Sequence, residues 1–155
     1  MEVGRVDASI RPATEADLDR IVLFNLAMAR ETEGKTLHRR VVRRGVHALL
    51  RDPGLGGYYL AEVSGEVAGQ LAVTTEWSDW RNAPVWWIQS VYVSKRHRRR
   101  GVYRRLHAHV REEARKAGAV GLRLYVERDN RAAQRTYAAM NMSESPYVMY
   151  SEMWT

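Results

Sequence analysis

The sequence predicts an α/β domain whose sheet contains strands of mixed direction and carries helices on both faces. Segments with strand-like alternation and segments with helical spacing follow one another in the order β-α-α-β-β-β-α-β-α-β, which is typical of such a sheet. The 155 residues contain no internal repeat or linker and have the usual length of one domain, so residues 1–155 are interpreted as a single domain. Cysteine is absent, which excludes a disulfide scaffold, a Cys-ligated zinc site and a thiol nucleophile.

The first third of the chain predicts one strand and two helices. Residues 9–12 favour a short strand that enters a turn. Residues 14–17 resemble a capping box with Asp at its last position, and apolar residues then recur with helical spacing, which predicts a helix over residues 14–29. A polar break over residues 31–35 separates it from a second predicted helix over residues 39–50.

The middle third predicts three consecutive strands. Residues 58–63 and 67–75 are rich in β-branched, aromatic and apolar residues, and the Ser-Gly-Glu sequence at 64–66 predicts a hairpin turn between them. Residues 77–84 are expected to form a loop. Residues 85–93 are again rich in aromatic and β-branched residues and predict the third strand.

The last third predicts two helices, each preceded or followed by a strand. An apolar stripe predicts a helix over residues 101–116, with Gly118 as its stop. Residues 120–126 alternate and predict a strand, residues 130–140 predict a helix, and residues 147–154 predict a final strand. The chain therefore contains six predicted strands.

The positive charge of the chain is concentrated in one segment. The net charge is +7, and residues 94–105 contain no acidic residue. The seven basic residues of this segment are Lys95, Arg96, Arg98, Arg99, Arg100, Arg104 and Arg105. The rest of the chain holds 18 basic and 18 acidic residues, so it is neutral. A local patch of this kind favours a localised polyanion, either a phosphorylated cofactor or a nucleic-acid backbone.

The patch lies where the strand over residues 85–93 is followed by the start of a helix. A helix start leaves backbone N–H groups unpaired, and its dipole favours an anion. Gly101 allows a phosphate to approach the backbone closely, and the arginines add charge-assisted hydrogen bonds. The pattern predicts a pyrophosphate cradle; the alternative is a solvated basic helix start. The spacing matches neither a Walker A loop nor a dinucleotide fingerprint.

A second pattern follows the strand over residues 120–126. Asn130 is placed to cap the next helix, and the small Ala133 permits close approach of a ligand. Tyr137 lies about two turns beyond Asn130 on nearly the same face, where its phenol could donate a proton to a leaving thiolate. Taken alone, Tyr137 is better interpreted as a core tyrosine with its hydroxyl at the surface.

Together the two patterns resemble the GNAT superfamily of acyl-CoA-dependent N-acyltransferases. That family has an R/Q-x-x-G-x-G/A loop after its fourth strand and an N-x-x-A-x-x-x-Y helix after its fifth. Arg98, Gly101 and Tyr103 occupy the first pattern here, and the second falls on residues 130–137. The order of elements also matches over residues 9–154. The resemblance implies a GNAT-like, mostly antiparallel sheet of six to seven strands.

The resemblance implies that acetyl-CoA is the cofactor and that a primary amine attacks its thioester directly. Backbone amides over residues 98–103 would bind the pyrophosphate, the edge of residues 91–93 and Asn130 would hold the pantetheine arm, and Tyr137 would protonate the thiolate. An N–H such as that of Val91 would hold the acetyl oxygen. The residues implied in cofactor binding are Val91, Tyr92, Val93, Arg98, Arg99, Arg100, Gly101, Val102, Tyr103, Arg104, Asn130, Ala133 and Tyr137.

Two positions depart from the family pattern. Tyr103 stands where the family prefers Gly or Ala, which would shift the helix start or narrow the phosphate site. Asn141 and Met142 stand where Gly-Phe usually ends the second motif. Asn tolerates a left-handed backbone and Met fills an apolar slot, so little disturbance is expected there.

The sequence does not single out the base that accepts the proton of the amine. Glu31, Glu33 and Glu76 are the candidates, together with a water chain that Gln89 could position. Four tryptophans at residues 77, 80, 86 and 87 lie near Glu76 and Asp79. Aromatic and acidic side chains together favour a small cationic amine as acceptor, whereas protein N-termini and lysine side chains remain open.

Two other functions stay open. A nucleic-acid-binding module would use the patch over residues 96–105 but gives no role to Asn130, Ala133 and Tyr137. The other alternative is a regulatory domain that keeps the fold and binds acyl-CoA but has lost the catalytic activity. We expect a cytoplasmic protein without a targeting or membrane-spanning segment. We further expect no nucleic-acid partner, no membrane partner and no metal, and the resemblance to the family makes a homodimer possible.

Overall fold

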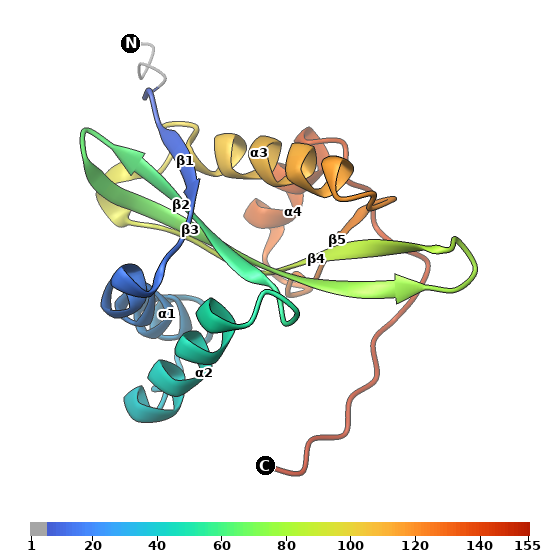
Figure 1. Ribbon diagram of the computed structural model, residues 1–155, viewed down its shortest axis with the longest axis horizontal. Coiled ribbons are helices and arrows are strands. Elements are labelled where there is room, and N and C mark those ends of the chain that lie inside the picture. Colours follow the sequence, from blue (N-terminus) through green and yellow to red (C-terminus); the bar gives the residue numbers. More distant parts are fainter. Residues whose placement is uncertain (1–5) are drawn as a thin grey trace. The chain divides into compact units, whose positions relative to one another are not determined.

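The computed structural model describes residues 6–155, which form two compact units (Figure 1). The first unit ends at Tyr125, and the second comprises Val126–Thr155. The elements of the first unit are β1 (Ser9–Pro12), α1 (Leu18–Glu33), α2 (Arg39–Arg51), β2 (Gly57–Val63), β3 (Glu66–Ser78), β4 (Ala83–Val93), α3 (Val102–Lys116) and β5 (Leu122–Leu124). Single 3-10 turns, η1 (Glu15–Asp17) and η2 (Lys95–His97), precede α1 and follow β4. The second unit contains α4 (Arg131–Ala139).

The sheet of the first unit has the order β1-β2-β3-β4-β5. The first four strands are antiparallel neighbours, and β5 pairs with β4 in parallel. Because the connection between two parallel strands must return along the sheet, α3 forms a crossover between β4 and β5. The expected mixed and mostly antiparallel sheet is confirmed.

Each face of this sheet is covered by helices, as expected (Figure 1). On one face, Ile21 and Val22 of α1 and Val46 of α2 pack with Leu60 and Ala72 of the sheet. On the other face, Val102, Leu106 and Val110 of α3 pack with Leu71, Val73 and Ile88, and all six are buried. Burial of the apolar stripe of each helix against the sheet is the main stabilising contribution of these contacts.

Two local predictions are confirmed in atomic detail. The backbone N–H of Thr14 donates to the Asp17 carboxylate at 2.8 Å, as in a capping box. Ser64 and Gly65 join β2 to β3 with φ of 52° and 76°. Two consecutive positive φ values define the type I′ turn that suits a two-residue hairpin.

The first helix ends later in the sequence than predicted. It ends at Glu33 and not near residue 29, and Gly34 closes it with a left-handed φ of 63°. The polar residues after Ala29 face solvent on further helical turns, so the loss of apolar spacing does not end the helix. Glu31 and Glu33 therefore lie in the last turn of α1 and not in a break.

The hairpin between β3 and β4 is longer than predicted, whereas β5 is shorter. Residues 76–78 and 83–84 are paired, so only residues 79–82 remain as a loop where residues 77–84 were expected. Cross-strand pairing extends both strands beyond their apolar segments. The strand predicted over residues 120–126 is reduced to Leu122–Leu124, which is as far as β4 pairs with it.

Residues 147–154 do not form the predicted strand, so residues 6–155 contain five strands and not the expected six to seven. No described residue of the second unit belongs to a strand, and residues 147–154 are exposed. Tyr150 and Trp154 are 92% and 86% exposed. Aromatic and β-branched composition favours a strand only when a neighbouring strand supplies the ladder hydrogen bonds, and here none does.

In the described chain, no helix is long and apolar enough to cross a membrane. The assignment of the whole chain to one domain stays a prediction.

Candidate active site

A β-bulge interrupts β4 near its centre. Ser90 pairs with Ala72 and Ile88 pairs with Val73, which leaves Gln89 without a counterpart on β3. The Gln89 side chain donates to Thr74 Oγ1 at 2.8 Å. Bulges bend a strand and redirect its backbone groups, and they are common next to active sites.

Beyond the bulge, β4 is no longer paired with β5. The parallel register joins Trp86–Ile88 to Leu122–Leu124 and stops there. In the described part of the chain, β5 is the only strand on that side of β4, so residues 89–93 have an open edge. Val91, Tyr92 and Val93 belong to this edge, where main-chain groups are available to an extended ligand, except Val93 O, which accepts from Arg98 at 2.8 Å.

The turn between β4 and α3 has the backbone geometry of an anion cradle. Arg99 and Gly101 have φ of 60° and 83°. Left-handed residues that alternate with right-handed ones turn successive N–H groups to one side, which forms an anion-binding concavity. The N–H of Arg105 donates to Gly101 O at 3.1 Å and closes the first turn of α3. A Cβ atom at Gly101 would meet nothing within 4 Å, so space remains at the cradle.

The cradle therefore fits a phosphate group. Its backbone N–H groups belong to the start of a 15-residue helix, whose dipole favours negative charge. Val102 is buried and anchors this helix start below Gly69, where a Cβ would lie 3.3 Å from Val102 Cγ1. Arg100 is half-buried and Arg104 is exposed, so cationic side chains surround the same backbone segment.

Arg98 is held by the end of α1. Its guanidinium donates to Glu31 Oε2 at 2.5 Å and to Val93 O at 2.8 Å, and it lies 5.4 Å from the centre of the Tyr92 ring. The Tyr92 hydroxyl donates to the other oxygen of Glu31 at 3.2 Å. Mainly because of the hydrogen bond from Arg98, the pKa of Glu31 is lowered. Glu31 thus joins α1 to the cradle.

Tyr103 does not block the helix start. Its hydroxyl lies 3.2 Å from Nδ1 of His107, one turn further along α3, and its ring packs against the core below that helix. His107 is buried, and its Nε2 lies 3.3 Å from Nη2 of Arg111. Burial lowers the pKa of His107 to about 4, so the imidazole is neutral and fits between the phenol and the guanidinium.

The second unit presents the residues of the second motif on α4. Asn130 caps this helix as predicted, because its Oδ1 accepts from the N–H of Ala133 at 3.1 Å. Tyr137 is half-buried, and burial raises the pKa of its phenol, so the hydroxyl keeps its proton at neutral pH. Asn141 has a left-handed φ of 65°, as expected for its place after α4.

The three candidate carboxylates each pair with a cation. Besides Glu31, Glu33 accepts from Lys35 at 2.6 Å. Glu76 accepts from Arg123 at 2.7 Å and from the indole N–H of Trp87 at 3.2 Å. The structure does not bring the three together, because Glu31 and Glu33 end α1 whereas Glu76 lies in β3.

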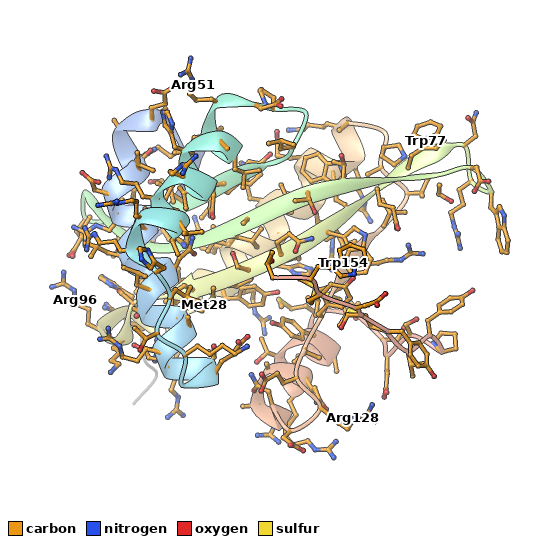
Figure 2. All side chains as sticks on the ribbon, turned by 90° about the horizontal axis from the view of Figure 1, so that it is seen from below. Met28, Arg51, Trp77, Arg96, Arg128 and Trp154 are labelled. Carbon is orange, nitrogen blue, oxygen red and sulfur yellow. The ribbon has the colours of Figure 1, made fainter. Side chains whose placement is uncertain are left out.

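The tryptophans are also separated. Trp86 packs partly buried against the core, whereas Trp77 and Trp80 are 63% and 85% exposed at the β3–β4 hairpin. Figure 2 shows Trp77 at the opposite end of the first unit from Met28 and Arg96. The hairpin tryptophans therefore do not surround the cradle.

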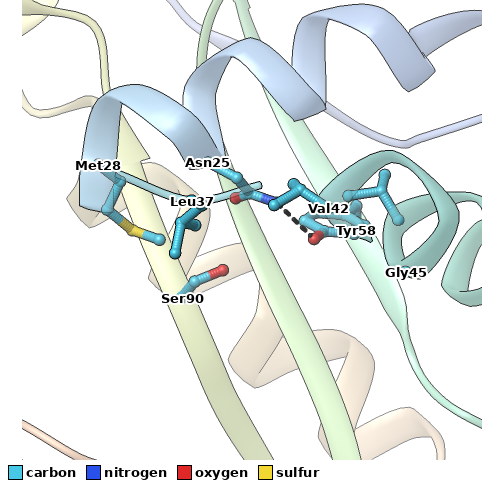
Figure 3. Close-up of a pocket in the computed structure, with 8 residues that line it drawn as sticks. Asn25, Met28, Leu37, Val42, Gly45, Tyr58 and Ser90 are labelled. Carbon is cyan, nitrogen blue, oxygen red and sulfur yellow. Dashed lines mark hydrogen bonds between the residues drawn. The ribbon is translucent and has the colours of Figure 1, made fainter. Parts of the chain in front are cut away.

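A cavity of about 320 Å³ lies between α1, α2 and the sheet, at residues that the sequence patterns did not identify (Figure 3). It is lined by Asn25, Met28, Leu37, Val42, Gly45, Val46, Tyr58 and Ser90. The sequence contains one signal that could have indicated this cavity, namely polar residues within apolar segments: Asn25 interrupts the apolar face of α1, and Gln70 interrupts an apolar strand. Gln70 is fully buried and donates to Asn25 Oδ1 at 2.8 Å, and Asn25 donates to the Tyr58 hydroxyl at 3.1 Å.

No group of histidine and acidic side chains suited to hold a metal occurs among residues 6–155.

Comparison with known proteins points to one family. The model of the acetyltransferase (GNAT) family matches residues 8–142. A solved structure of a possible acetyltransferase from Clostridium difficile 630 is 44% identical, with a TM-score of 0.90 over 96% of this chain and 98% of that one. No curated protein matches the sequence.

Two more distant structures share the fold. A ribosomal-protein-alanine N-acetyltransferase from Brucella melitensis biovar Abortus 2308 has 15% identity and a TM-score of 0.76, covering 95% of this chain and 99% of that one. An aminoglycoside N-acetyltransferase in complex with CoA has 15% identity and a TM-score of 0.80, covering 97% of each chain. At this identity the likeness concerns the fold alone.

Proposed function

Because the chain belongs to the GNAT acetyltransferase family, we propose that it transfers an acetyl group from acetyl-CoA to a primary amine of a small cationic molecule. Members of this family are acetyl-CoA-dependent N-acetyltransferases. The observation that supports the cofactor in this chain is the left-handed turn at Arg99 and Gly101 ahead of α3, whose N–H groups fit a phosphate.

The cofactor would supply an activated acetyl thioester. Residues 98–104 would bind its pyrophosphate through backbone N–H groups and through the side chains of Arg99, Arg100 and Arg104. The open edge of β4 at Val91–Val93 would pair with the pantetheine arm, and Asn130 and Ala133 would hold that arm from α4. The backbone N–H groups alone would bind any phosphate of suitable size. The arginines would strengthen this binding by their charge, and the pairing of the pantetheine arm with the β4 edge would select coenzyme A over other phosphates.

The chain's own groups would perform three tasks in the reaction. A backbone N–H next to the bulge, such as that of Val91, would donate to the acetyl oxygen as negative charge develops there. Tyr137 would donate its phenolic proton to the leaving thiolate, for which its raised pKa keeps it ready at neutral pH. The attacking amine would pass its proton to water, because Glu31, Glu33 and Glu76 already pair with cations.

The nucleic-acid alternative is less well supported by the charges of the patch. Arg96 pairs with Glu66, Arg98 with Glu31 and Arg105 with Asp7. Lys95 also lies 3.7 Å from Glu31 Oε1, so four of the seven basic residues pair with acidic side chains, which weakens the attraction of a phosphate backbone. The degenerate regulatory domain would differ from the enzyme only in lacking turnover.

Titration calorimetry of the purified protein with acetyl-CoA tests the proposal, with ATP and desulfo-CoA as comparison ligands. We expect acetyl-CoA to bind and Gly101→Glu to weaken it, because that change puts a carboxylate at the cradle. Gly118→Glu, just beyond the far end of α3, makes the same substitution at a glycine with a similar φ of 81° and should leave the affinity unaltered. Absence of acetyl-CoA binding would exclude the enzyme, and binding without turnover on any amine would favour the regulatory domain.

A further inference from the structure

The cavity between α1, α2 and the sheet has no charged wall. None of the described residues that line it is acidic or basic, and most are apolar, as Met28, Leu37 and Val42 illustrate in Figure 3. A ligand that carries several ammonium groups would lose hydration there without gaining an ionic partner. The cavity therefore disfavours polycations.

The polar groups of the cavity are few and are held in place. The Tyr58 hydroxyl accepts from Asn25 at 3.1 Å, and Asn25 accepts from the buried Gln70 at 2.8 Å. Burial raises the pKa of Tyr58, so its own proton remains available for a ligand. Ser90 supplies the second hydroxyl, from β4.

The position of Ser90 connects the cavity to the reaction centre. Ser90 directly follows the bulge at Gln89, and Tyr92, two residues on, lies on the same face of β4. Tyr92 packs against Phe24 of α1 at a ring distance of 4.9 Å and bonds to Glu31, which holds Arg98. One face of α1 thus contacts the cavity through Met28 and the cradle through Glu31, one turn apart.

From these contacts we infer that the cavity binds the acceptor, and that the acceptor is a monoamine with one apolar body, such as an arylalkylamine. The inference rests on the proposed function and specifies that the small cationic acceptor carries a single ammonium group. The apolar body lies between Met28, Leu37 and Val42, and the nitrogen points to Ser90 and the bulge. The volume of about 320 Å³ is near the lower limit of ligand pockets, which suits a small body.

Gly45 offers a direct test because it lines the cavity from α2. A Cβ atom added there meets nothing within 4 Å, so a larger side chain enters free space. Gly45→Leu also replaces a poor helix former by a good one, which favours a folded protein. Arg44→Leu is the matched control: it introduces the same side chain at the adjacent exposed residue of α2, which does not line the cavity.

The experiment is calorimetric titration with 2-phenylethylamine and with spermidine, without acetyl-CoA, followed by acetyl-transfer assays with both amines. We expect 2-phenylethylamine to bind at least about tenfold more tightly than spermidine. Gly45→Leu should weaken 2-phenylethylamine binding by about tenfold or more, whereas Arg44→Leu should not. Val42→Glu, which adds a carboxylate to the cavity wall, should raise the affinity for spermidine.

Equal or tighter binding of spermidine by the unaltered protein would overturn the inference, as would 2-phenylethylamine binding that Gly45→Leu leaves unchanged. Acetyl-CoA titration of the same proteins separates this outcome from failure of the proposed function. Acetyl-CoA binding without 2-phenylethylamine binding refutes the acceptor class alone. Gly45-sensitive binding of 2-phenylethylamine without acetyl-CoA binding supports the monoamine cavity and refutes the transferase.

Discussion

Glu31 and Arg98 connect the last turn of α1 to the turn before α3, with Oε2 of the carboxylate 2.5 Å from Nη2 of the guanidinium. From the sequence alone, Glu31 is a candidate base and Arg98 a candidate phosphate ligand. In the structure the two side chains bind each other. This arrangement favours a positioning role for Glu31, because a carboxylate with a lowered pKa is a weak proton acceptor near neutral pH.

Glu31→Gln should therefore reduce kcat by less than about tenfold, whereas loss of a general base costs about 10²-fold or more. The acidic limb of the pH–rate profile should keep its position.

The contribution of the Glu31–Arg98 ion pair to stability is present above the ordinary Glu pKa of 4.5 and is lost as the pH falls through the lowered pKa of Glu31. Urea unfolding at neutral pH should show a loss of about 1 kcal/mol. Glu66→Gln, which releases Arg96 at the surface, is the control.

Tyr137→Phe should lower kcat by about 10²-fold or more and leave the affinity for acetyl-CoA within about twofold, since it removes a proton and little contact area. Steady-state kinetics and calorimetry measure the two quantities. Because the acid form of the phenol is the active one and its pKa is raised, activity should persist through neutral pH and fall only in the alkaline range. Parallel losses in kcat and affinity would assign Tyr137 to cofactor binding instead.

His107 should make the protein less stable in mild acid. Its pKa is lowered from 6.5 to about 4 in the folded state, so the folded protein binds fewer protons than the unfolded chain between these values. The free energy of unfolding is therefore highest above pH 6.5 and decreases as the pH falls toward 4. The decrease is on the order of 3 kcal/mol, at about 1.4 kcal/mol per unit.

Urea unfolding of the unaltered protein and of His107→Gln across this pH range measures the effect. The free energy of unfolding of the variant should depend less steeply on pH than that of the unaltered protein, because the substitution removes the titrating imidazole. Identical pH dependence in both proteins would show that other groups account for the acid sensitivity.

Arg99 combines a left-handed backbone with a side chain at the cradle. Its φ of 60° costs an L-residue about 1 kcal/mol, so Arg99→Gly should raise the unfolding free energy by about that amount and Arg99→Ala should not. Both variants should weaken acetyl-CoA binding equally if the guanidinium contacts the phosphates. Thermal unfolding and calorimetry at two salt concentrations test this; a greater affinity of Arg99→Gly would show that backbone shape matters more than charge.

Several features of the candidate site were predictable because they depend on neighbouring residues. The cradle needs basic residues, a glycine and a helix start within a few residues, and the sequence shows all three around Gly101. The cap by Asn130 and the turn at Ser64 and Gly65 are equally local. By contrast, the cavity brings together side chains of α1, α2, β2 and β4, up to 65 residues apart along the chain, from Asn25 to Ser90.

The sequence by itself determined the order of elements as far as α4, the mixed sheet covered on both faces, the family and the basic turn, because periodicity and short motifs encode local backbone geometry. Only the tertiary structure decided that β4 bulges at Gln89, that Glu31 pairs with Arg98 and that Tyr103 turns toward His107. It also left residues 147–154 unpaired. These features depend on partners distant in sequence, whose positions only packing and hydrogen bonding can fix.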